Sequence, residues 1–279
     1  MTEGTVARKR LLLTGAAGRI GTAFRRYAGD RYDLCLGVHH LGKLEDPGGG
    51  HEVVELEIAD PASCQEACKG IDVVIHLAGS PSPRADFYDT LLDSNIKGTF
   101  NIFQAACDQG CQRVIFTSSV QAVVGYPLDV QVYPDSPVRP LNMYGVCKCF
   151  GEATAHYFAY AKGLSSIVVR VGTFESDWVK RQAYARHLST FISRRDMSHL
   201  LVRCIETPDI QFAIVHGVSN NRFKFLDITS ARELLEYDPQ DDAFQIFDIG
   251  LQFSDQWFSK SLGSGIFARP SQSATEVGD

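Results

Sequence analysis

The sequence predicts an α/β fold, a doubly wound parallel sheet with helices on both faces, followed by a smaller C-terminal lobe. Two observations carry this prediction. From residue 10 to about residue 171, apolar stretches of strand length alternate with amphipathic stretches of helix length, which is the pattern of consecutive β–α–β units. Beyond residue 172 the alternation weakens. With 279 residues, the chain has room for one large domain and a smaller one.

Six apolar stretches are predicted to be buried strands. They are rich in Val, Ile and Leu, as expected where helices cover both faces of a parallel sheet. The six are RLLLTG (10–15), YDLCLGV (32–38), HEVVELEI (51–58), DVVIHLAG (72–79), RVIFTSS (113–119) and SSIVVRVG (165–172). Between two of them, the segment from Phe87 to Asp108 has the 3.6-residue periodicity of an amphipathic helix.

The C-terminal third has a different pattern. RDMSHLLVRCIE (195–206) and ITSARELLEY (228–237) are predicted helices on either side of a short strand, QFAIVHG (211–217). The final residues are small and polar, which is typical of a disordered end. We therefore predict a first domain at 1–171, a small lobe at 172–262 and a disordered tail at 263–279.

Composition excludes several classes of function. The formal net charge is −6, and no block of Lys and Arg offers a surface for nucleic acid. No apolar run approaches the roughly 18 residues needed to span a bilayer. The first ten residues, MTEGTVARKR, lack the apolar core of a signal peptide. We expect a cytoplasmic protein that acts on a small molecule, without nucleic-acid or membrane partners.

The eight cysteines are predicted to be reduced side chains that pack in the core. They fall inside predicted helices and strands of a large chain, where thiols behave as small apolar groups. Cys64 shares a helical face with Cys68, and Cys107 shares one with Cys111. Neither pair has the further His or Cys ligands of a zinc site, so we predict no metal.

A glycine-rich turn follows the first strand. In TGAAGRIG, the glycines Gly15, Gly18 and Gly21 recur every three residues. Such glycines let the backbone turn sharply and approach a pyrophosphate, which then lies on the positive N-terminus of the helix that begins near Arg19. Because the motif follows a strand and opens a helix, it predicts dinucleotide binding.

Tyr144 and Lys148 lie four residues apart in NMYGVCKCFGE (142–152), a segment predicted to begin a helix. At this spacing the two side chains share one helical face. A nearby ammonium favours the ionised phenol and lowers a pKa that starts near 10. The pair could therefore form a base, although chance is the commoner explanation of this spacing when it is taken alone.

Four motifs together resemble one family. TGAAGRIG, HLAG (76–79), FTSS (116–119) and YGVCK (144–148) are similar, in order and spacing, to those of the extended short-chain dehydrogenases/reductases. The resemblance implies a nicotinamide dinucleotide bound to a Rossmann-type sheet formed by residues 1–171. It also implies that Tyr144 is the general acid/base, that Lys148 binds the nicotinamide ribose and that Ser119 orients the reacting hydroxyl.

The same resemblance implies a set of cofactor-binding residues. Besides Tyr144 and Lys148, they are Gly15, Gly18, Arg19, Ile20, Gly21, Glu57, Ile58, Leu77, Ala78 and Gly79. Members that prefer NAD usually carry an acidic residue at the end of the second strand, where this chain has Val38 and His39. Arg19, His39 and Lys43 are either solvated loop residues or partners for a 2′-phosphate. We therefore predict NAD, with NADP as the open alternative.

Within this family, the sequence is most similar to the uronate dehydrogenases, which oxidise the C1 hydroxyl of a free hexuronate to an aldarolactone. Three segments carry the similarity: YGVCKCFGE (144–152), ARHLSTFISRRD (185–196) and YDPQDDAF (237–244). The resemblance implies that Arg186 grips the C6 carboxylate with its planar fork. It also implies that Thr173, with Ser119 and Tyr144, contacts the substrate.

Two positions depart from that family. After Ser119 we expect polar residues of the Asn-His kind, but the sequence has Val120 and Gln121. The pocket chemistry therefore differs, and a related uronate or a neutral aldose stays open as the substrate.

Two other functions also remain as alternatives. A nucleotide-sugar epimerase or dehydratase uses the same Tyr and Lys but normally has a larger C-terminal domain. A regulator that senses a dinucleotide without chemistry would have little use for an intact Ser119, Tyr144 and Lys148 set. We therefore predict a dehydrogenase of a sugar or sugar acid, and we expect it to be a homo-oligomer.

Overall fold

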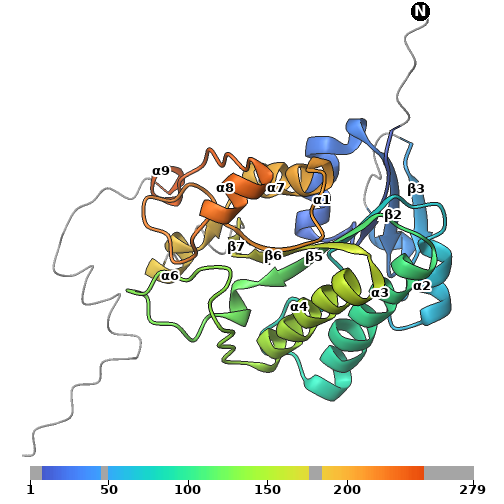
Figure 1. Ribbon diagram of the computed structural model, residues 1–279, viewed down its shortest axis with the longest axis horizontal. Helices are drawn as coiled ribbons and strands as arrows, with labels where there is room; N and C mark the ends of the chain where they lie inside the picture. The colour runs from blue at the N-terminus through green and yellow to red at the C-terminus, as the bar shows by residue number, and fades with distance from the viewer. Residues whose placement is uncertain (1–7, 45–49, 176–183, 248–279) are drawn as a thin grey trace, which may run out of the picture.

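The structure, a computed structural model, describes residues 8–44, 50–175 and 184–247. Its centre is a seven-stranded sheet with the order β3-β2-β1-β4-β5-β6-β9 (Figure 1). The strands are β1 (Arg10–Thr14), β2 (Asp33–Val38), β3 (Glu52–Glu55), β4 (Val73–His76), β5 (Arg113–Ser119), β6 (Ser165–Val171) and β9 (Phe212–Gly217). Every neighbouring pair is parallel, which confirms the predicted fold class.

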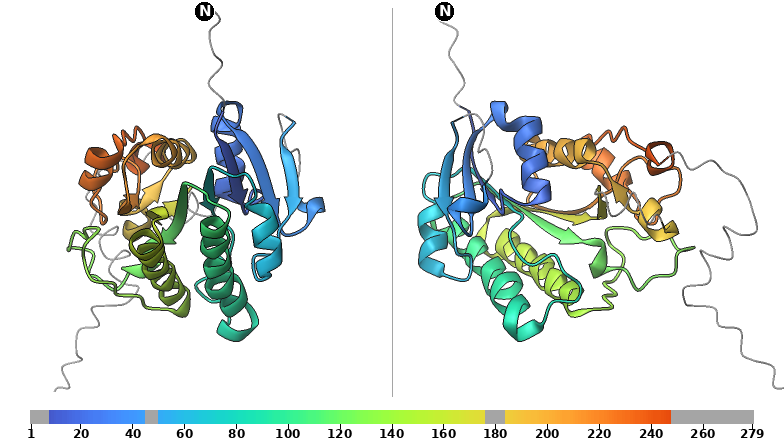
Figure 2. Two further views of the ribbon diagram at one scale, coloured as in Figure 1. Left: turned by 45° about the vertical axis from the view of Figure 1, so that its right-hand side comes forward. Right: turned by 180° about the vertical axis from the view of Figure 1, so that it is seen from behind.

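Helices cover both faces of this sheet (Figures 1 and 2). One face carries α1 (Arg19–Ala28), α7 (Arg194–Glu206) and α8 (Thr229–Leu235), and the other carries α2 (Pro61–Ala67), α3 (Gly98–Asp108) and α4 (Met143–Lys162). Successive strand residues point to opposite faces. Leu11 and Leu13 accordingly join the core under α1 and α7, whereas Leu12 joins the core under α2 and α3. Burial on both faces explains why the strands are apolar throughout.

The strand order creates a crevice at one edge of the sheet. From β1 the chain adds β2 and β3 on one side, and from β4 it adds β5, β6 and β9 on the other. Connections leave β1 and β4 in opposite directions, so a gap opens at their carboxyl ends, where open α/β sheets bind ligands. Gly15 directly follows β1 and Leu77 directly follows β4.

The segment predicted as one helix between residues 87 and 108 has two parts. Phe87–Lys97 forms η3, which has the wider turns of a π-helix, and it continues directly into α3. The side chain of Asp86 caps the first turn by accepting hydrogen bonds from the backbone N–H groups of Tyr88 and Asp89, at 2.8 and 2.9 Å. Wide helical turns of this kind often lie at functional sites, and η3 borders the crevice.

The chain beyond β6 contributes to the main sheet. The strand expected inside a separate lobe is β9, which pairs with β6 over six residues and completes the sheet. Between β6 and β9 lie the two-stranded pair β7 (Thr173–Phe174) and β8 (Phe191–Ile192), with α6 (Ala185–Ser189) between them. The helix α9 (Ala243–Ile246) follows α8. The division at residue 171 stays a prediction, and the end of the lobe and the tail lie outside the described residues.

The remaining class predictions concern thiols and membranes. Each of the eight cysteines is a free thiol, and six are buried, as expected for residues that pack in a core. In the described ranges, no helix has both the length and the apolar character needed to cross a membrane. The same ranges hold no cluster of His, Cys, Asp or Glu that could bind a metal ion.

Candidate active site

The turn after β1 brings the N-terminus of α1 to the crevice. Gly15 has a φ of +68°, a conformation that glycine adopts at little cost. A Cβ atom at this position would lie 2.9 Å from the backbone nitrogen of Ala78, so a larger residue would collide with the loop after β4. Gly18 is the N-cap of α1, and no side chain caps this helix. The first N–H groups of α1 therefore remain available to an anion.

Thr14 ties this turn to the loop after β4. Its Oγ1 accepts hydrogen bonds of 3.1 Å from the backbone N–H groups of Leu77 and Ala78. The same hydroxyl lies 2.9 Å from Nδ1 of His76. Burial, and to a smaller extent the charge of Lys148, lowers the pKa of His76 to about 3. The imidazole is therefore neutral and can accept the hydroxyl hydrogen, which fixes both loops.

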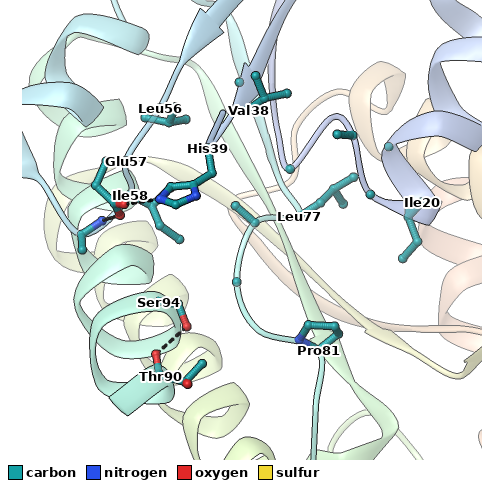
Figure 3. Close-up of a pocket in the computed structure, with 18 of the residues that line it drawn as sticks. Ile20, Val38, His39, Leu56, Glu57, Ile58, Leu77, Pro81, Thr90 and Ser94 are labelled. Carbon is teal, nitrogen blue, oxygen red and sulfur yellow. Dashed lines mark hydrogen bonds and ion pairs between the residues drawn. The ribbon is translucent and has the colours of Figure 1, made fainter. Parts of the chain in front are cut away.

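A cavity of about 730 Å³, the larger cavity, occupies the crevice (Figure 3). Ten residues predicted to bind the cofactor line it: Gly15, Gly18, Arg19, Ile20, Gly21, Glu57, Ile58, Leu77, Ala78 and Gly79. Sequence patterns did not single out Thr90 and Ser94 of η3, which also line it and are joined by a 2.7 Å hydrogen bond from Oγ of Ser94 to the carbonyl of Thr90. The structure thus brings the predicted cofactor residues together.

His39 and Glu57 form a pair on the wall of the larger cavity (Figure 3). Nε2 of His39 lies 2.8 Å from Oε2 of Glu57, and both side chains are about half exposed. The other oxygen of Glu57 accepts a 2.8 Å hydrogen bond from the backbone N–H of Ala59. An acidic side chain from the segment after β3 therefore lies in contact with the histidine that directly follows β2.

Ser119, Tyr144 and Lys148 meet at the carboxyl end of β5. Ser119 ends that strand, and the other two lie on the first turns of α4. The hydroxyl of Ser119 lies near enough to the Tyr144 phenol to favour its ionised form and lower its pKa in part. Nζ of Lys148 donates a 2.8 Å hydrogen bond to the carbonyl of Thr117 and lies 5.6 Å from the centre of the Tyr144 ring. All three side chains are buried.

The expectation that Lys148 lowers the pKa of the phenol is wrong for this structure. Burial raises the pKa of Tyr144, and the hydroxyl of Ser119 offsets only part of that rise. Burial also lowers the pKa of Lys148 to about 8, with smaller opposing effects of Cys147 and Glu152. The ammonium binds a backbone carbonyl rather than the phenol, so the cost of burying charge outweighs the attraction between the two groups.

A buried ion pair holds α4 against the sheet below these residues. Glu152, one turn after Lys148, accepts hydrogen bonds from Nε and Nη2 of Arg170 at 2.9 and 2.8 Å. Ser118 donates a further hydrogen bond of 2.5 Å to the same carboxylate. Removing one member of such a pair typically costs about 3–5 kcal/mol, because the other charge stays buried. The pair therefore fixes the catalytic helix on β5 and β6.

A second cavity of about 460 Å³, the smaller cavity, adjoins the larger one. It is lined by every residue predicted to contact the substrate: Ser119, Tyr144, Thr173 and Arg186. Lys148 lines it as well, and Phe174 and Leu77 line both cavities. A ligand in the larger cavity could therefore reach the reacting side chains, which is the arrangement that transfer between a cofactor and a substrate requires.

Arg186 on α6 is held in a fixed position by neutral groups. Its Nη1 and Nη2 donate hydrogen bonds of 3.1 and 3.3 Å to the carbonyls of Val124 and Tyr126, and its guanidinium lies 4.8 Å from the ring centre of Phe225. Burial lowers the pKa of Arg186, and no carboxylate among the described residues pairs with its guanidinium. Its positive charge is therefore available to an anion in the smaller cavity.

A short chain of hydrogen bonds connects Thr173 to the backbone of Arg186. Oγ1 of Thr190 donates a 2.7 Å hydrogen bond to the carbonyl of Arg186. Oγ1 of Thr173 lies 2.8 Å from Oγ1 of Thr190 and donates to it, since the Thr190 hydrogen is already used. The lone pairs of Thr173 are then left to accept a hydrogen bond from a ligand.

Two residues of this site were not predicted to act in it. Asn142 caps α4, and Gln121, noted only as a departure from the family, lines the smaller cavity and is hydrogen-bonded to Asn142. An Asn directly before a predicted helix is a recognisable capping signal. The contact between residues 121 and 142 has no such signal in the sequence.

The fold and this set of side chains define a dinucleotide-dependent enzyme of the short-chain dehydrogenase/reductase type. Residues 11–212 match the NAD dependent epimerase/dehydratase family, and the chain belongs to that family. The extended family predicted from the four motifs is thus confirmed.

Individual relatives are dehydrogenases of sugars and sugar acids. The chain is 36% identical over 252 residues to the NAD-dependent glucose-6-phosphate dehydrogenase of Haloferax volcanii, covering 84% of this chain and 94% of that one. It is 34% identical over 236 residues to a uronate dehydrogenase of Pseudomonas putida, covering 84% and 85%. The crystal structure of uronate dehydrogenase from Agrobacterium tumefaciens superposes with a TM-score of 0.77 at 28% identity, covering 95% and 93%.

Proposed function

We propose that the protein oxidises the C1 hydroxyl of a free hexuronate to an aldarolactone with NAD. The observation that carries this proposal is that Arg186 lines the same cavity as Ser119, Tyr144 and Lys148. A guanidinium held by neutral carbonyls suits a carboxylate, since within the described residues no carboxylate neutralises its charge. Similarity to two uronate dehydrogenases supports the same substrate class.

The larger cavity fits a nicotinamide dinucleotide. The uncapped N–H groups of α1 suit a pyrophosphate, and the absence of a side chain at Gly15 allows the close approach of the loops that flank it. His39 and Glu57 would then lie beside the adenosine part, with Glu57 able to accept from a ribose hydroxyl. When bound, NAD would supply the acceptor for the hydride that leaves C1.

The side chains of the smaller cavity would divide the remaining work. The hydroxyls of Ser119 and Tyr144 would hold the C1 hydroxyl, and Oη of Tyr144 would take its proton. Because burial raises the pKa of Tyr144, the phenol stays protonated until positive charge is available nearby. Lys148 on the same helical face would bind the nicotinamide ribose, and the positive charge of the bound nicotinamide would then favour loss of the phenol proton. Arg186 and Thr173 would hold the far end of the sugar.

A hexose 6-phosphate is a second candidate substrate. The relative from Haloferax volcanii, a glucose-6-phosphate dehydrogenase, is 36% identical to this chain. A phosphate at C6 would place an anion where the uronate has its carboxylate, and Arg186 would suit either group. The two candidates therefore share the requirement for an anion at C6 and differ in its size and charge.

Identification of the product tests the proposal. Purified protein would be incubated with NAD and, separately, with glucuronate, galacturonate, glucose 6-phosphate, glucose and UDP-glucose. We expect the uronates to give equal amounts of reduced nicotinamide, by absorbance, and of lactone, by NMR. A higher kcat/KM on glucose 6-phosphate would select the second candidate. An epimer of UDP-glucose without net reduced nicotinamide would instead make the protein an epimerase, and binding of NAD without turnover of any sugar would make it a sensor.

The expected homo-oligomer also belongs to this proposal. Six residues of α4 recur at alternating spacings of three and four, face away from Tyr144 and Lys148, and are exposed or half-buried: Met143, Val146, Phe150, Ala153, Tyr157 and Tyr160. This is the spacing of an apolar helix-pairing seam, which a second copy of α4 would cover in a symmetric dimer. Sedimentation should show a dimer that Tyr160→Arg weakens, and a monomer at all concentrations would contradict it. We further propose that the enzyme works in the cytoplasm.

A further inference from the structure

Gln121 and Asn142 connect the two segments that carry the reacting side chains. Nδ2 of Asn142 lies 2.8 Å from Oε1 of Gln121, and Oδ1 of Asn142 accepts a 2.8 Å hydrogen bond from the backbone N–H of Gly145. The backbone N–H of Gln121 donates to Oγ of Ser119 over 3.2 Å. Gln121 is therefore fixed between Ser119 and the helix that begins with Tyr144.

The direction of these bonds determines which end of Gln121 is left over. The backbone N–H of Gly145 can only donate, so the atom of Asn142 that it meets is the carbonyl oxygen. The other end of Asn142 is then its NH₂ group, which also only donates, and Gln121 must present its own carbonyl oxygen to it. The NH₂ group of Gln121 is consequently the unused end of the amide.

That unused end belongs to a side chain that lines the smaller cavity. Within the described part of the chain, the amide of Gln121 is paired only through Oε1. The half-buried side chain thus offers two N–H donors beside Ser119, the residue proposed to orient the C1 hydroxyl. The family resemblance implies polar residues of the Asn-His kind at 120 and 121, so the amide of Gln121, together with its partner Asn142, is particular to this chain.

We propose that Asn142 is a positioning residue that locks the amide of Gln121 with its NH₂ group toward the sugar, where it binds an oxygen that can only accept. In a hexuronate such oxygens are the ring oxygen, next to C1, and the carboxylate. A hydroxyl group could pair with either end of a free amide, so a locked donor matters only for an oxygen without a hydrogen. The sugar contact rests on the proposed function, whereas the lock does not.

Asn142→Asp tests the lock because it replaces the donor that faces Gln121 with an acceptor, while the side chain can still cap α4. Asp caps a helix as well as Asn does, but it replaces the NH₂ group that faces Gln121 with an oxygen. The amide of Gln121 should turn to donate to this oxygen, and its carbonyl should then face the sugar. Residue 142 does not itself line the smaller cavity, so the effect on the sugar must pass through Gln121.

A double-mutant cycle separates this relay from the added charge. We expect Asn142→Asp to lower kcat/KM for the sugar about 10- to 100-fold when Gln121 is present, mainly by raising KM. The Gln121→Met variant lacks the amide but keeps a side chain of similar length. In that variant, Asn142→Asp should lower kcat/KM only a few-fold, through the added negative charge. Equal losses in both backgrounds, or a loss confined to kcat, would overturn the proposed contact with the sugar.

A measurement without substrate tests the lock on its own. The side-chain amide signals of Gln121 would be assigned by NMR from their disappearance in Gln121→Met, and their exchange with water would be followed in the substrate-free enzyme. We expect slower exchange in Asn142→Asp, since the NH₂ group then donates to a carboxylate. Unchanged exchange would overturn the lock. If the wild type oxidised no sugar, the proposed function and the sugar contact would both be wrong. The NMR measurement would still decide whether Asn142 locks the amide of Gln121.

Discussion

The two cavities that meet at Phe174 are built by different means. The larger one is shaped mainly by backbone, through the turn at Gly15, the N-terminus of α1 and the loop after β4. The smaller one is built from side chains that come from β5, α4 and α6. Backbone contacts depend on the fold, whereas side-chain contacts change with single substitutions. Changes in the smaller cavity that spare Lys148 and the wall shared by the two cavities should therefore alter sugar kinetics and leave the affinity for NAD intact.

The largest effect is expected from Tyr144→Phe. The substitution removes the hydroxyl that takes the C1 proton and keeps the ring that packs in the core. General acid/base groups typically contribute about 10²–10⁴-fold, so kcat should fall by that factor while the Kd for NAD, measured by titration, stays within about twofold. A variant that keeps more than about a tenth of wild-type kcat would show that another group takes the proton.

Arg186→Ala should give the next largest effect, restricted to acidic sugars. Loss of a charge-assisted hydrogen bond typically costs about 1.5–3 kcal/mol, or roughly 10- to 150-fold in kcat/KM on glucuronate and galacturonate. Slow oxidation of glucose or galactose, whose C6 group is neutral, should change little. Arg194→Ala is the matched control, because it removes the same charge from an exposed residue outside the smaller cavity. Equal losses on acids and neutral sugars would remove Arg186 as the carboxylate partner.

The lowered pKa of Lys148, which lines the smaller cavity, can be tested through the pH dependence of stability. Burial lowers its pKa from the usual 10.5 to about 8. Below pH 8 the folded and unfolded chains both carry the charge, and the folded state bears the full cost of burying it. Between pH 8 and 10.5 the unfolded chain binds more protons than the folded one, so wild-type stability gains with rising pH.

Lys148→Met should therefore affect the free energy of unfolding differently at pH 7 and at pH 10. Its effect at pH 7 should be more stabilising than its effect at pH 10 by about 1–3 kcal/mol. Urea unfolding at the two pH values measures this difference. Lys162→Met, which changes an exposed lysine at the end of the same helix, should show no such trend. A difference between wild type and Lys148→Met that is the same at both pH values would contradict the lowered pKa.

The smallest effect concerns the choice of dinucleotide in the larger cavity. His39 stands where a carboxylate would repel a 2′-phosphate, and Glu57 reaches the same place from another segment while paired to it. Exposed charges of this kind typically contribute about 1 kcal/mol or less, so NAD should be preferred over NADP by only about 2- to 5-fold in kcat/KM. His39→Asp should widen that preference. A wild-type preference for NADP would reverse the cofactor assignment.

The sequence predicted the fold through local patterns. The six predicted strands and the glycine turn follow from apolar runs and spacing, which burial on both faces of a parallel sheet imposes. The place of β9 beside β6 was not predicted, because the order of strands in a sheet depends on contacts between distant segments. The first half of the helix at 87–108 likewise has wider turns than its apolar periodicity indicates.

The candidate site was predicted in the same uneven way. The spacing of Tyr144 and Lys148 placed them on one face, but it could not show that both are buried or that the lysine binds the carbonyl of Thr117. The sign of the pKa shift of Tyr144 depends on that burial. Gln121 and Asn142 are 21 residues apart, and their contact exists only because the chain after the end of β5 lies beside the start of α4.

The most direct test of the account is the ratio of wild-type kcat/KM for glucuronate to that for glucose, with NAD and absorbance of the reduced nicotinamide. The two sugars differ only at C6, where one carries the carboxylate that Arg186 is proposed to bind. One charge-assisted contact predicts a ratio of roughly 10 to 150 in favour of the acid. A ratio of one or below would contradict a site for acidic sugars, even if the protein proved to be an active dehydrogenase.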